Sequence, residues 1–311
     1  MKIVFMGTPD FAKESLQAIC ESGYEVSCVV TKPDKKQGRG MKIVQTPVKQ
    51  YANSKNILVL QPEKVKQNVE FIEKIKKINP DVICVVAYGK ILPKELLEIP
   101  CLGCINVHGS LLPKYRGAAP IQWSVLNGDK YTGITTMYRD EGMDTGDMIL
   151  KEQVEIGKNE TTGELWSRLS VLGGKMLVET LNQVENGTAK REKQGLEFTY
   201  APMIQKEISH INWNKMTAVE IKNLVRGLNP IMGAYSFLEG KKIKFWKVEE
   251  EVSDENTKPG TIIASNNKDG LVIKAKEGKI RVLEIQGENA KRMDIYSFLR
   301  GNAIEENKCF E

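Results

Sequence analysis

The chain has 311 residues, of which 41% are hydrophobic and 27% are charged, and its formal net charge is +5. This length exceeds what one ordinary hydrophobic core organises, so two domains are expected. The mild positive charge permits a polyanionic partner without requiring one. No apolar run approaches the ~20 residues that span a bilayer, so no membrane-spanning helix is predicted.

The six cysteines lie mostly inside apolar segments. The first apolar run is too short to be the hydrophobic core of a signal peptide. We therefore expect reduced thiols and a cytoplasmic protein.

Predicted strands and helices alternate through the first half of the chain. Apolar runs predict strands at 2–6, 26–30, 57–60, 82–87, 105–108, 133–138 and 148–156. Helical periodicity predicts helices at 11–21, 69–78, 121–126 and 161–184. The last of these helices begins with a capping box formed by Thr161 and Glu164. This alternation predicts an α/β fold built on a doubly wound, mostly parallel, Rossmann-like sheet.

The turn after the first strand reads Gly7-Thr8-Pro9-Asp10. It lacks the G-x-G-x-x-G pattern that dinucleotide-binding turns use to approach a pyrophosphate. A nicotinamide-dependent dehydrogenase is therefore poorly supported.

The pattern of apolar residues changes after residue 186. Residues 186–205 are polar and have no clean period, which predicts a linker. A helix is predicted at 217–228, capped by Thr217 and Glu220. Short strands are predicted at 234–238, 243–248, 260–264, 271–275 and 280–285. Five short strands favour a small OB-like β-barrel. The predicted parts are a domain at 1–189, a linker at 190–206 and a C-terminal domain at 207–311.

Basic and aromatic residues are interleaved from Lys241 to Lys247. Such a segment could face a nucleic acid through its aromatic rings and charges. Alternatively it is a strand that buries Ile243, Phe245 and Trp246 and leaves its lysines in solvent. The sequence alone slightly favours the second interpretation.

The most informative segment contains His108, one of only two histidines in the chain. Asn106 lies two residues earlier and therefore on the same face of the predicted strand. Ligands bind at the carboxyl ends of strands in sheets of this kind, so this position favours a functional histidine over a core residue. The spacing of Cys101, Cys104 and His108 resembles part of a zinc site. No second Cys/His pair lies at a usual spacing, so no metal is predicted.

These residues resemble those of the folate-dependent formyltransferases. Asn106-Val107-His108, the loop that follows it and the distant Asp144 resemble that family's catalytic trio and folate-contacting loop. The segment 140–147 contains four carboxylates, and only the family pattern selects Asp144 among them. The resemblance implies that Asn106, His108 and Asp144 are catalytic and that 10-formyltetrahydrofolate is the formyl donor. It also implies that the folate is contacted by Ser110, Leu111, Leu112 and Pro113.

Further segments resemble the members of that family that act on a tRNA. The segment Phe5–Ala12 opens the chain as it does in those members, and residues 32–49 resemble their inserted, tRNA-contacting loop. The resemblance implies that the acceptor is the α-amine of initiator methionyl-tRNA and that Arg39 and Lys42 contact the tRNA. It further implies that the C-terminal domain at 207–311 binds the tRNA. On this interpretation we expect a monomer that serves translation initiation.

Two alternatives remain open at this point. Family members that act on an amino sugar nucleotide share the Asn-x-His-Gly-Ser-Leu-Leu-Pro segment, and other members act on a purine precursor. The choice of acceptor therefore depends mainly on the 32–49 loop and on the second domain. The other alternative is a non-catalytic nucleic-acid-binding protein, and the presence of all three catalytic candidates argues against it.

The implied reaction needs oxyanion stabilisation more than it needs a strong base. An α-amine has a pKa of ~7.7–8.0, so a useful fraction is neutral at cytosolic pH. We expect Asn106 and protonated His108 to donate hydrogen bonds to the formyl oxygen as the amine adds. We expect Asp144 to support the imidazolium charge and to pass the amine proton away through water.

Overall fold

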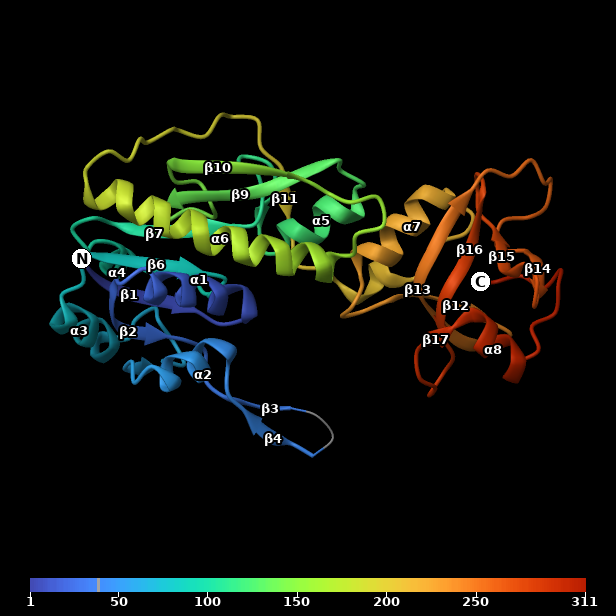
Figure 1. Cartoon of the computed structure of the whole chain (residues 1–311), viewed down its shortest axis with the longest axis horizontal. Helices are drawn as coiled ribbons and strands as arrows, with labels where there is room; N and C mark the ends of the chain where they lie inside the picture. The colour runs from blue at the N-terminus through green and yellow to red at the C-terminus, as the bar shows by residue number, and fades with distance from the viewer. Residues whose placement is uncertain (38–39) are drawn as a thin grey trace. The chain divides into compact units, whose positions relative to one another are not determined.

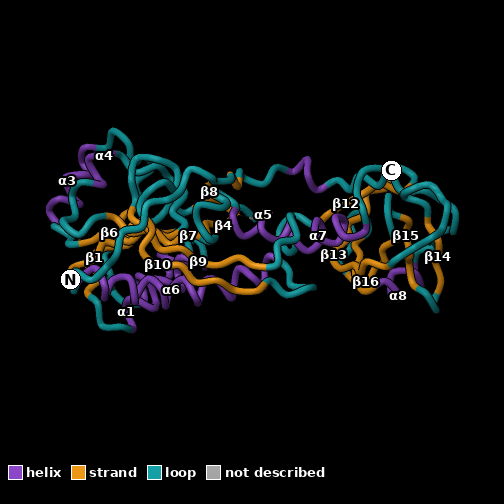
Figure 2. Tube along the Cα trace, turned by 90° about the horizontal axis from the view of Figure 1, so that it is seen from above, coloured by secondary structure: helices purple, strands orange, loops and turns teal. Residues whose placement is uncertain are grey.

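The computed structural model describes residues 1–37 and 40–311, and these residues form two compact units (Figures 1 and 2). The first unit comprises residues 1–120, 131–155 and 166–202. The second unit comprises residues 121–130, 156–165 and 203–311.

The first unit contains a seven-stranded sheet with the strand order β10-β9-β7-β6-β1-β2-β5. Its strands are β1 Lys2–Gly7, β2 Glu25–Val30, β5 Val59–Leu60, β6 Val82–Val86, β7 Cys104–His108, β9 Tyr131–Tyr138 and β10 Met148–Glu155. The first five of these strands are parallel to one another, whereas β9 runs antiparallel to β7 and β10 runs antiparallel to β9. The predicted mostly parallel sheet is therefore confirmed. The strand order reverses at β1, where open sheets of this type bind ligands at the carboxyl edge.

Helices cover both faces of this sheet. Helices α3 and α4 lie on one face and α1 and α6 on the other (Figure 2). The helices of this part are α1 Asp10–Glu21, α2 Pro47–Ser54, α3 Val69–Ile78, α4 Lys94–Leu97 and α6 Thr162–Glu185. Side chains of successive strand residues point to opposite faces of the sheet. Val4 and Met6 of β1 therefore share a face, and they pack in one cluster with Phe71 and Ile75 of α3. A Cβ at Gly174 of α6 would lie 3.1 Å from the Glu14 carbonyl oxygen of α1, so glycine permits this close approach.

Several short elements of the first unit carry no clear periodicity in the sequence. They are the hairpin strands β3 Lys35–Gln37 and β4 Lys42–Val44, and the two-residue strands β8 Arg116–Gly117 and β11 Tyr200–Ala201. Strands β8 and β11 pair in parallel, so a segment near residue 200 is joined to the loop that follows β7. This pairing lies within the first unit.

The second unit is an antiparallel sheet with a helix packed on it. The sheet contains β12 Ala234–Leu238, β13 Lys241–Glu251, β14 Ile262–Asn266, β15 Gly270–Lys274, β16 Lys279–Gln286 and β17 Met293–Asp294. The other elements are α5 Pro120–Leu126, the 3₁₀ helix Lys206–Ser209, α7 Ala218–Gly227 and α8 Ile295–Gly301. Ile221 and Val225 of α7 share one buried cluster with Phe245 and Val282 of the sheet.

The five strands predicted for the C-terminal part are confirmed, and so is the capping box of Thr217 and Glu220. A closed barrel is not shown. The pairing follows the path β12-β13-β16-β15-β14, with β17 on β16, and within the described residues no pairing joins β14 back to β12.

The strand 241–247 turns its aromatic residues inward. Phe245 is fully buried, and Ile243 and Trp246 are 6% and 8% exposed. The interpretation of this segment as a core strand with outer lysines is therefore confirmed.

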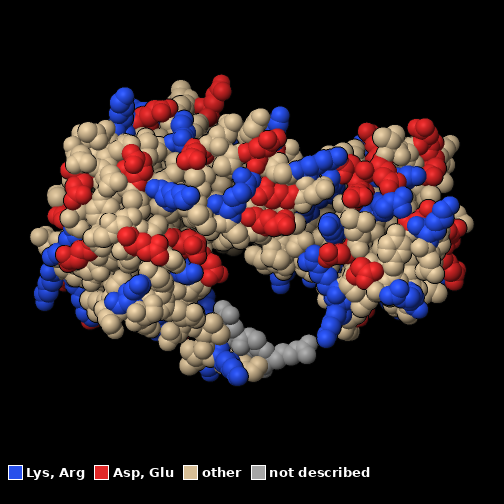
Figure 3. All heavy atoms as spheres, viewed as in Figure 1, with Lys and Arg blue, Asp and Glu red and all other residues tan. Residues whose placement is uncertain are grey.

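The surfaces of both units carry interspersed charges of both signs on the face shown in Figure 3. No helix in the described part of the chain is long and apolar enough to cross a bilayer.

Candidate active site

Strand β7 delivers two polar side chains to the carboxyl edge of the sheet. It lies between β6 and β9, with Asn106 opposite Val85 and Met137, and His108 opposite Thr135. Asn106 and His108 point to the same face because they are two residues apart. They are only 6% and 5% exposed. Two polar groups buried at a strand end need partners, and the partners identify the site.

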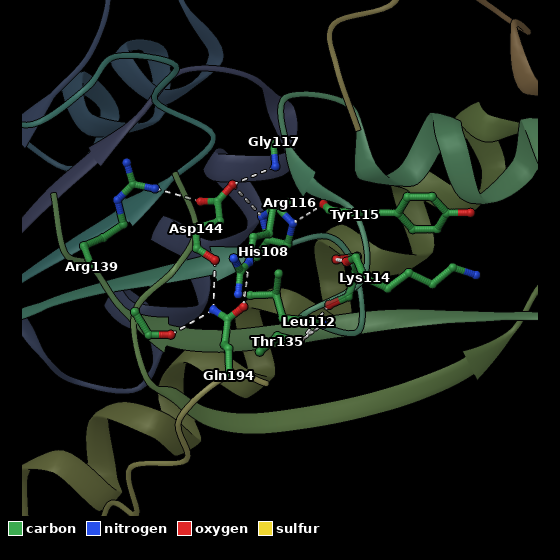
Figure 4. Close-up of polar contacts among 12 residues, drawn as sticks. His108, Leu112, Lys114, Tyr115, Arg116, Gly117, Thr135, Arg139, Asp144 and Gln194 are labelled. Carbon is green, nitrogen blue, oxygen red and sulfur yellow. Dashed lines mark hydrogen bonds and ion pairs between the residues drawn. The ribbon is translucent and has the colours of Figure 1, made fainter. Parts of the chain in front are cut away.

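Asp144 comes from the loop that joins β9 to β10, and it lies against His108 (Figure 4). Its Oδ2 is 3.6 Å from Nδ1 of the imidazole. The same oxygen accepts a hydrogen bond from the Gly117 amide at 3.0 Å, and Oδ1 accepts one from Arg139 Nη1 at 2.8 Å. Asp144 is 6% exposed and has a φ of +54°. The carboxylate is thus held on one side by a guanidinium and on the other by a backbone amide.

The second imidazole nitrogen has a partner of its own. Nε2 of His108 lies 2.8 Å from the carbonyl oxygen of Tyr115. Because a carbonyl only accepts, Nε2 carries a hydrogen and donates it. Nδ1 is therefore the nitrogen that can gain or release a proton, and it is the one that faces Asp144.

The side-chain amide of Asn106 is not held by any residue that the structure describes. Within residues 1–37 and 40–311 no hydrogen bond to its side chain is found. An amide without a protein partner remains able to donate and to accept hydrogen bonds. Asn106 is placed to donate to a small oxygen-bearing ligand.

The other carboxylates of the 140–147 segment have different environments. Asp140 is exposed and accepts hydrogen bonds from the Gly142 amide and the Thr145 hydroxyl, which close the loop on itself. Glu141 is exposed. The structure thus singles out Asp144 by burial and by its pairing with Arg139, which residue spacing alone does not reveal.

Hydrogen bonds within the loop and to β9 hold the loop that follows His108. The Ser110 hydroxyl donates to the Lys114 carbonyl at 2.6 Å, and the Leu112 amide donates to the Thr135 hydroxyl at 3.1 Å. The Leu112 side chain packs on two methionines, whereas Leu111 and Pro113 are partly exposed. A ligand can therefore contact Leu111 and Pro113 more readily than Ser110 or Leu112, which are buried.

The cysteines near His108 point to different partners. Cys101 Sγ lies 3.8 Å from the Asp81 carbonyl, and Cys104 Sγ lies 3.8 Å from the Leu97 carbonyl. Burial raises the pKa of the Cys104 thiol to about 12, so it does not offer a thiolate at neutral pH. In the part of the chain that the structure describes, no group of three or more His, Cys, Asp or Glu side chains could hold a metal.

Comparison with known families gives a match over most of the chain. Residues 1–181 match the family described as "Formyl transferase", and residues 203–303 match "Formyl transferase, C-terminal domain". The chain belongs to the formyl transferase family. The resemblance stated from Asn106, His108 and Asp144 is therefore confirmed at the level of the family.

Two curated relatives cover nearly the whole chain. A protein of Caldanaerobacter subterraneus subsp. tengcongensis named "Methionyl-tRNA formyltransferase" is 52% identical over 98% of this chain and 98% of its own length. A protein of the same name from Acetivibrio thermocellus is 50% identical over 99% of both chains. A solved N-formyltransferase from Helicobacter canadensis, in complex with folinic acid and dTDP-3-aminofucose, covers 93% of this chain and 100% of its own at a TM-score of 0.65 and 22% identity. That last likeness concerns the fold.

Four site residues were not predicted from the sequence: Arg139, Tyr115, Gly117 and Gln194. The sequence does contain an indication for Arg139, because a cation between a predicted strand and an acidic loop is placed to pair with a carboxylate of that loop. Tyr115 contributes only a backbone carbonyl, which sequence cannot single out. Gln194 donates to the carbonyls of Asp144 and Gly146 from 50 and 48 residues away, and nothing in its local sequence indicates this.

Of the two residues predicted to contact tRNA, only Lys42 lies within the described residues. Lys42 is exposed at the start of β4, and Arg39 lies outside the described residues. The base of the hairpin is held by Lys49, whose ammonium contacts Asp34 at 2.6 Å and Gln61 at 2.7 Å. The hydrogen bonds from Lys49 and Gln61 lower the pKa of the Asp34 carboxyl. This anchored hairpin presents Lys42 to solvent.

Proposed function

We propose that the protein transfers a formyl group from 10-formyltetrahydrofolate to the α-amine of initiator methionyl-tRNA, giving formylmethionyl-tRNA for translation initiation. The observation that carries this proposal is the identity of about half of all positions, over nearly the full length, with relatives named for that activity. An identity of this extent includes both units, so it concerns the acceptor as well as the formyl donor.

In this proposal Asn106 stabilises the charge that develops on the formyl oxygen. Addition of the amine to the formyl carbon turns a carbonyl oxygen into an oxyanion. Collapse of this adduct restores the carbonyl and breaks the bond between the formyl carbon and N10, and the released tetrahydrofolate takes up the proton that the amine loses. The Asn106 amide is buried and has no hydrogen-bond partner among the described residues, which suits a donor that meets its acceptor only when substrate is bound. Removing one such donor costs roughly 10²–10³ in rate in other enzymes.

His108 and Asp144 are proposed as the pair that moves the proton. Nε2 is committed to the Tyr115 carbonyl, so only Nδ1 can hand a proton to the oxyanion or take one from the amine. Asp144 lies 3.6 Å from Nδ1, a gap that a short movement closes to a hydrogen bond. Arg139 keeps the carboxylate oriented while the proton is transferred.

We propose that the formyl-folate lies against Ser110, Leu111, Leu112 and Pro113. The partial exposure of Leu111 and Pro113 supports an apolar contact there. Ser110 and Leu112 act by fixing the loop, since their polar groups are bonded to Lys114 and Thr135. The proposed donor needs no metal to carry its formyl group.

The tRNA is proposed to meet the hairpin and the C-terminal part. Arg39 and Lys42 supply positive charge for phosphate contacts, which dominate affinity for nucleic acids. We propose the division into a catalytic domain at 1–189, a linker at 190–206 and a tRNA-binding domain at 207–311. The antiparallel five-strand path of that domain supports an OB-like arrangement. On this proposal the enzyme is a cytoplasmic monomer.

The decisive experiment offers the protein several acceptors in parallel. It is incubated with 10-formyltetrahydrofolate and charged initiator tRNA, an amino sugar nucleotide, or the amine of a purine precursor. Formylmethionine is expected on the tRNA, and no transfer is expected to the other two acceptors. Transfer to one of the other amines would contradict the proposed acceptor. Binding of the tRNA without any transfer would contradict the proposed activity and favour a nucleic-acid-binding protein.

A further inference from the structure

A segment that the sequence predicts to be linker is built into the candidate active site. Glu192 exchanges two backbone hydrogen bonds with Met148 of β10, and Tyr200–Ala201 form β11 on β8. We call residues 192–201 the strap. Within residues 191–200, all of which the structure describes, Gln194 is the one half-buried residue and the others are exposed.

The Gln194 amide holds two loops at once (Figure 4). Its Nε2 donates to the Asp144 carbonyl at 2.8 Å and to the Gly146 carbonyl at 2.9 Å. Its Oε1 accepts from Nε of Arg116 at 2.9 Å. Both donor hydrogens and the acceptor oxygen are therefore used, which is the full set of groups that a carboxamide offers in one plane.

The same strap fixes the carbonyl that His108 uses. The Thr199 hydroxyl accepts from the Tyr115 amide at 2.9 Å, and the Thr199 carbonyl accepts from the Arg116 amide at 2.8 Å. Tyr115 has a φ of +63°, a conformation that a bulky residue rarely adopts unless its surroundings impose it. These contacts aim the Tyr115 carbonyl at Nε2 of His108.

The two loops that Gln194 joins are the loops that hold the proton-transfer pair. One carries Asp144, whose backbone carbonyl is bonded to Gln194. The other carries Tyr115, which orients His108, and Gly117, which donates to the Asp144 carboxylate. Arg116, between them, donates to Gln194 and stacks its guanidinium 4.5 Å from the centre of the Phe198 ring.

We propose that Gln194 is a positioning residue for formyl transfer, acting by setting the distance between Asp144 and His108. This inference rests on the proposed function, since it assigns Gln194 to the proton-transfer pair of that reaction. Gln194 touches neither imidazole nor carboxylate, so its effect passes through the backbone of the loops. A displacement of catalytic groups by about 1 Å is enough to cost 10²-fold in rate.

The test compares four single variants and one double variant of the full chain. Gln194→Ala removes all three hydrogen bonds, and Gln194→Met removes them while keeping the length of the side chain. Gln17→Ala is the matched control, because Gln17 makes one exposed hydrogen bond to Glu21 in the same unit. Asp144→Asn alone and combined with Gln194→Ala completes a cycle. Both kcat and the KM for each substrate are measured well below the melting temperature of every variant.

Both Gln194 variants are expected to lower kcat by about tenfold to a hundredfold with each KM within about twofold of wild type. Gln17→Ala is expected to match wild type. The double variant is expected to be no slower than Asp144→Asn, because residues that act as one unit are not additive. A kcat of Gln194→Met above half the wild-type value, or losses that multiply in the double variant, would overturn the inference. A wild-type protein that transfers no formyl group to the tRNA would instead sink the proposed function.

Discussion

The carboxyl edge of the first unit and the sheet of the second unit both bury polar side chains, but they use them differently. In the second unit, buried cations are paired with groups of the same unit. Lys222 forms an ion pair with Glu250, and Arg226 donates hydrogen bonds to the carbonyls of Gly157 and Glu160. At the carboxyl edge, Asp144 lies against His108, and the Asn106 amide has no hydrogen-bond partner among the described residues. Polar groups that are paired within the protein stabilise the fold, whereas a polar group without a protein partner is available to a ligand. The comparison therefore supports placing the proposed chemistry in the first unit.

The largest effect is expected from the three groups at the carboxyl edge. Asn106→Asp, His108→Gln and Asp144→Asn each keep size while removing a donor or a charge. Each is expected to lower kcat by roughly 10²–10³, as for the loss of an oxyanion donor in other enzymes. Formylation of charged initiator tRNA under single-turnover conditions measures this.

Asp140→Asn is the matched control for Asp144→Asn, because Asp140 lies in the same loop but is exposed. Its rate is expected to stay within about twofold of wild type. Equal losses in the two variants would remove the distinction between Asp144 and its neighbours.

A smaller effect is expected on stability in the second unit. Glu220 caps α7, and hydrogen bonds from the Thr217 backbone and hydroxyl lower the pKa of its carboxyl. Glu220→Ala is expected to lower the free energy of unfolding by about 1 kcal/mol at pH 7, the usual value of a cap. A lowered folded pKa gives stability that is present above the unfolded value of about 4.3 and lost as the pH falls through the folded one.

The difference between wild type and Glu220→Ala is therefore expected to shrink below about pH 4. Urea unfolding at pH 7 and pH 3 measures it, with the exposed Glu288→Ala as control. A difference that grows in acid would contradict the assigned direction of the pKa shift. The formylation rate of Glu220→Ala at neutral pH is expected to be nearly unchanged. This result would show that the second unit contributes the cap to stability and not to the chemical step.

A smaller effect again is expected from the exposed hairpin. Lys42→Ala is expected to weaken tRNA binding and to reduce the slope of log affinity against log salt by about one, the value of one phosphate contact. The KM for formyl-folate is expected not to change. Lys74→Ala on α3 serves as control, because Lys74 is an exposed lysine paired with Glu70. Identical slopes for the two variants would exclude Lys42 from the tRNA contact.

The smallest effect on activity is expected from the cysteines. Cys101 is exposed, whereas burial raises the pKa of both Cys28 and Cys104 to about 12. A raised pKa leaves little thiolate at pH 8, so the buried thiols are expected to react with a disulfide reagent only after denaturation. Cys101→Ser is expected to remove the fastest reaction, to leave the slower reaction of the half-buried Cys20 and Cys309, and to leave formylation intact. Modification of Cys28 or Cys104 before denaturation, located by mass spectrometry, would show that a buried thiol is accessible.

Much of the architecture could be predicted because it depends on local patterns. The apolar runs of β1, β6 and β7 and the periodicity of α3 predicted these elements to within one or two residues. The capping boxes of Thr161 and Thr217 predicted two helix starts, and reciprocal hydrogen bonds are found at both. The β3–β4 hairpin was missed because its strands have three residues each, too few to show a period.

The candidate site was predictable only in part. His108 was found because it is a rare side chain at a strand end, and Asn106 because it shares the strand face. Asp144 was selected by family resemblance alone, since its burial and its bond to Arg139 are properties of the folded loop.

The sequence by itself determined the parallel sheet, the strand that carries Asn106 and His108, and the family of the chain, since these follow from short-range periodicity and from residue identity. The tertiary structure alone decided which imidazole nitrogen is free, which carboxylate faces it, and that Gln194 joins the two loops around them. The last two features depend on contacts between residues that are 36 to 78 positions apart. The first depends on the Tyr115 carbonyl, which lies in a loop held by Thr199, 84 positions from Tyr115. No local pattern records such contacts, because they form only when the whole sheet and its loops have folded.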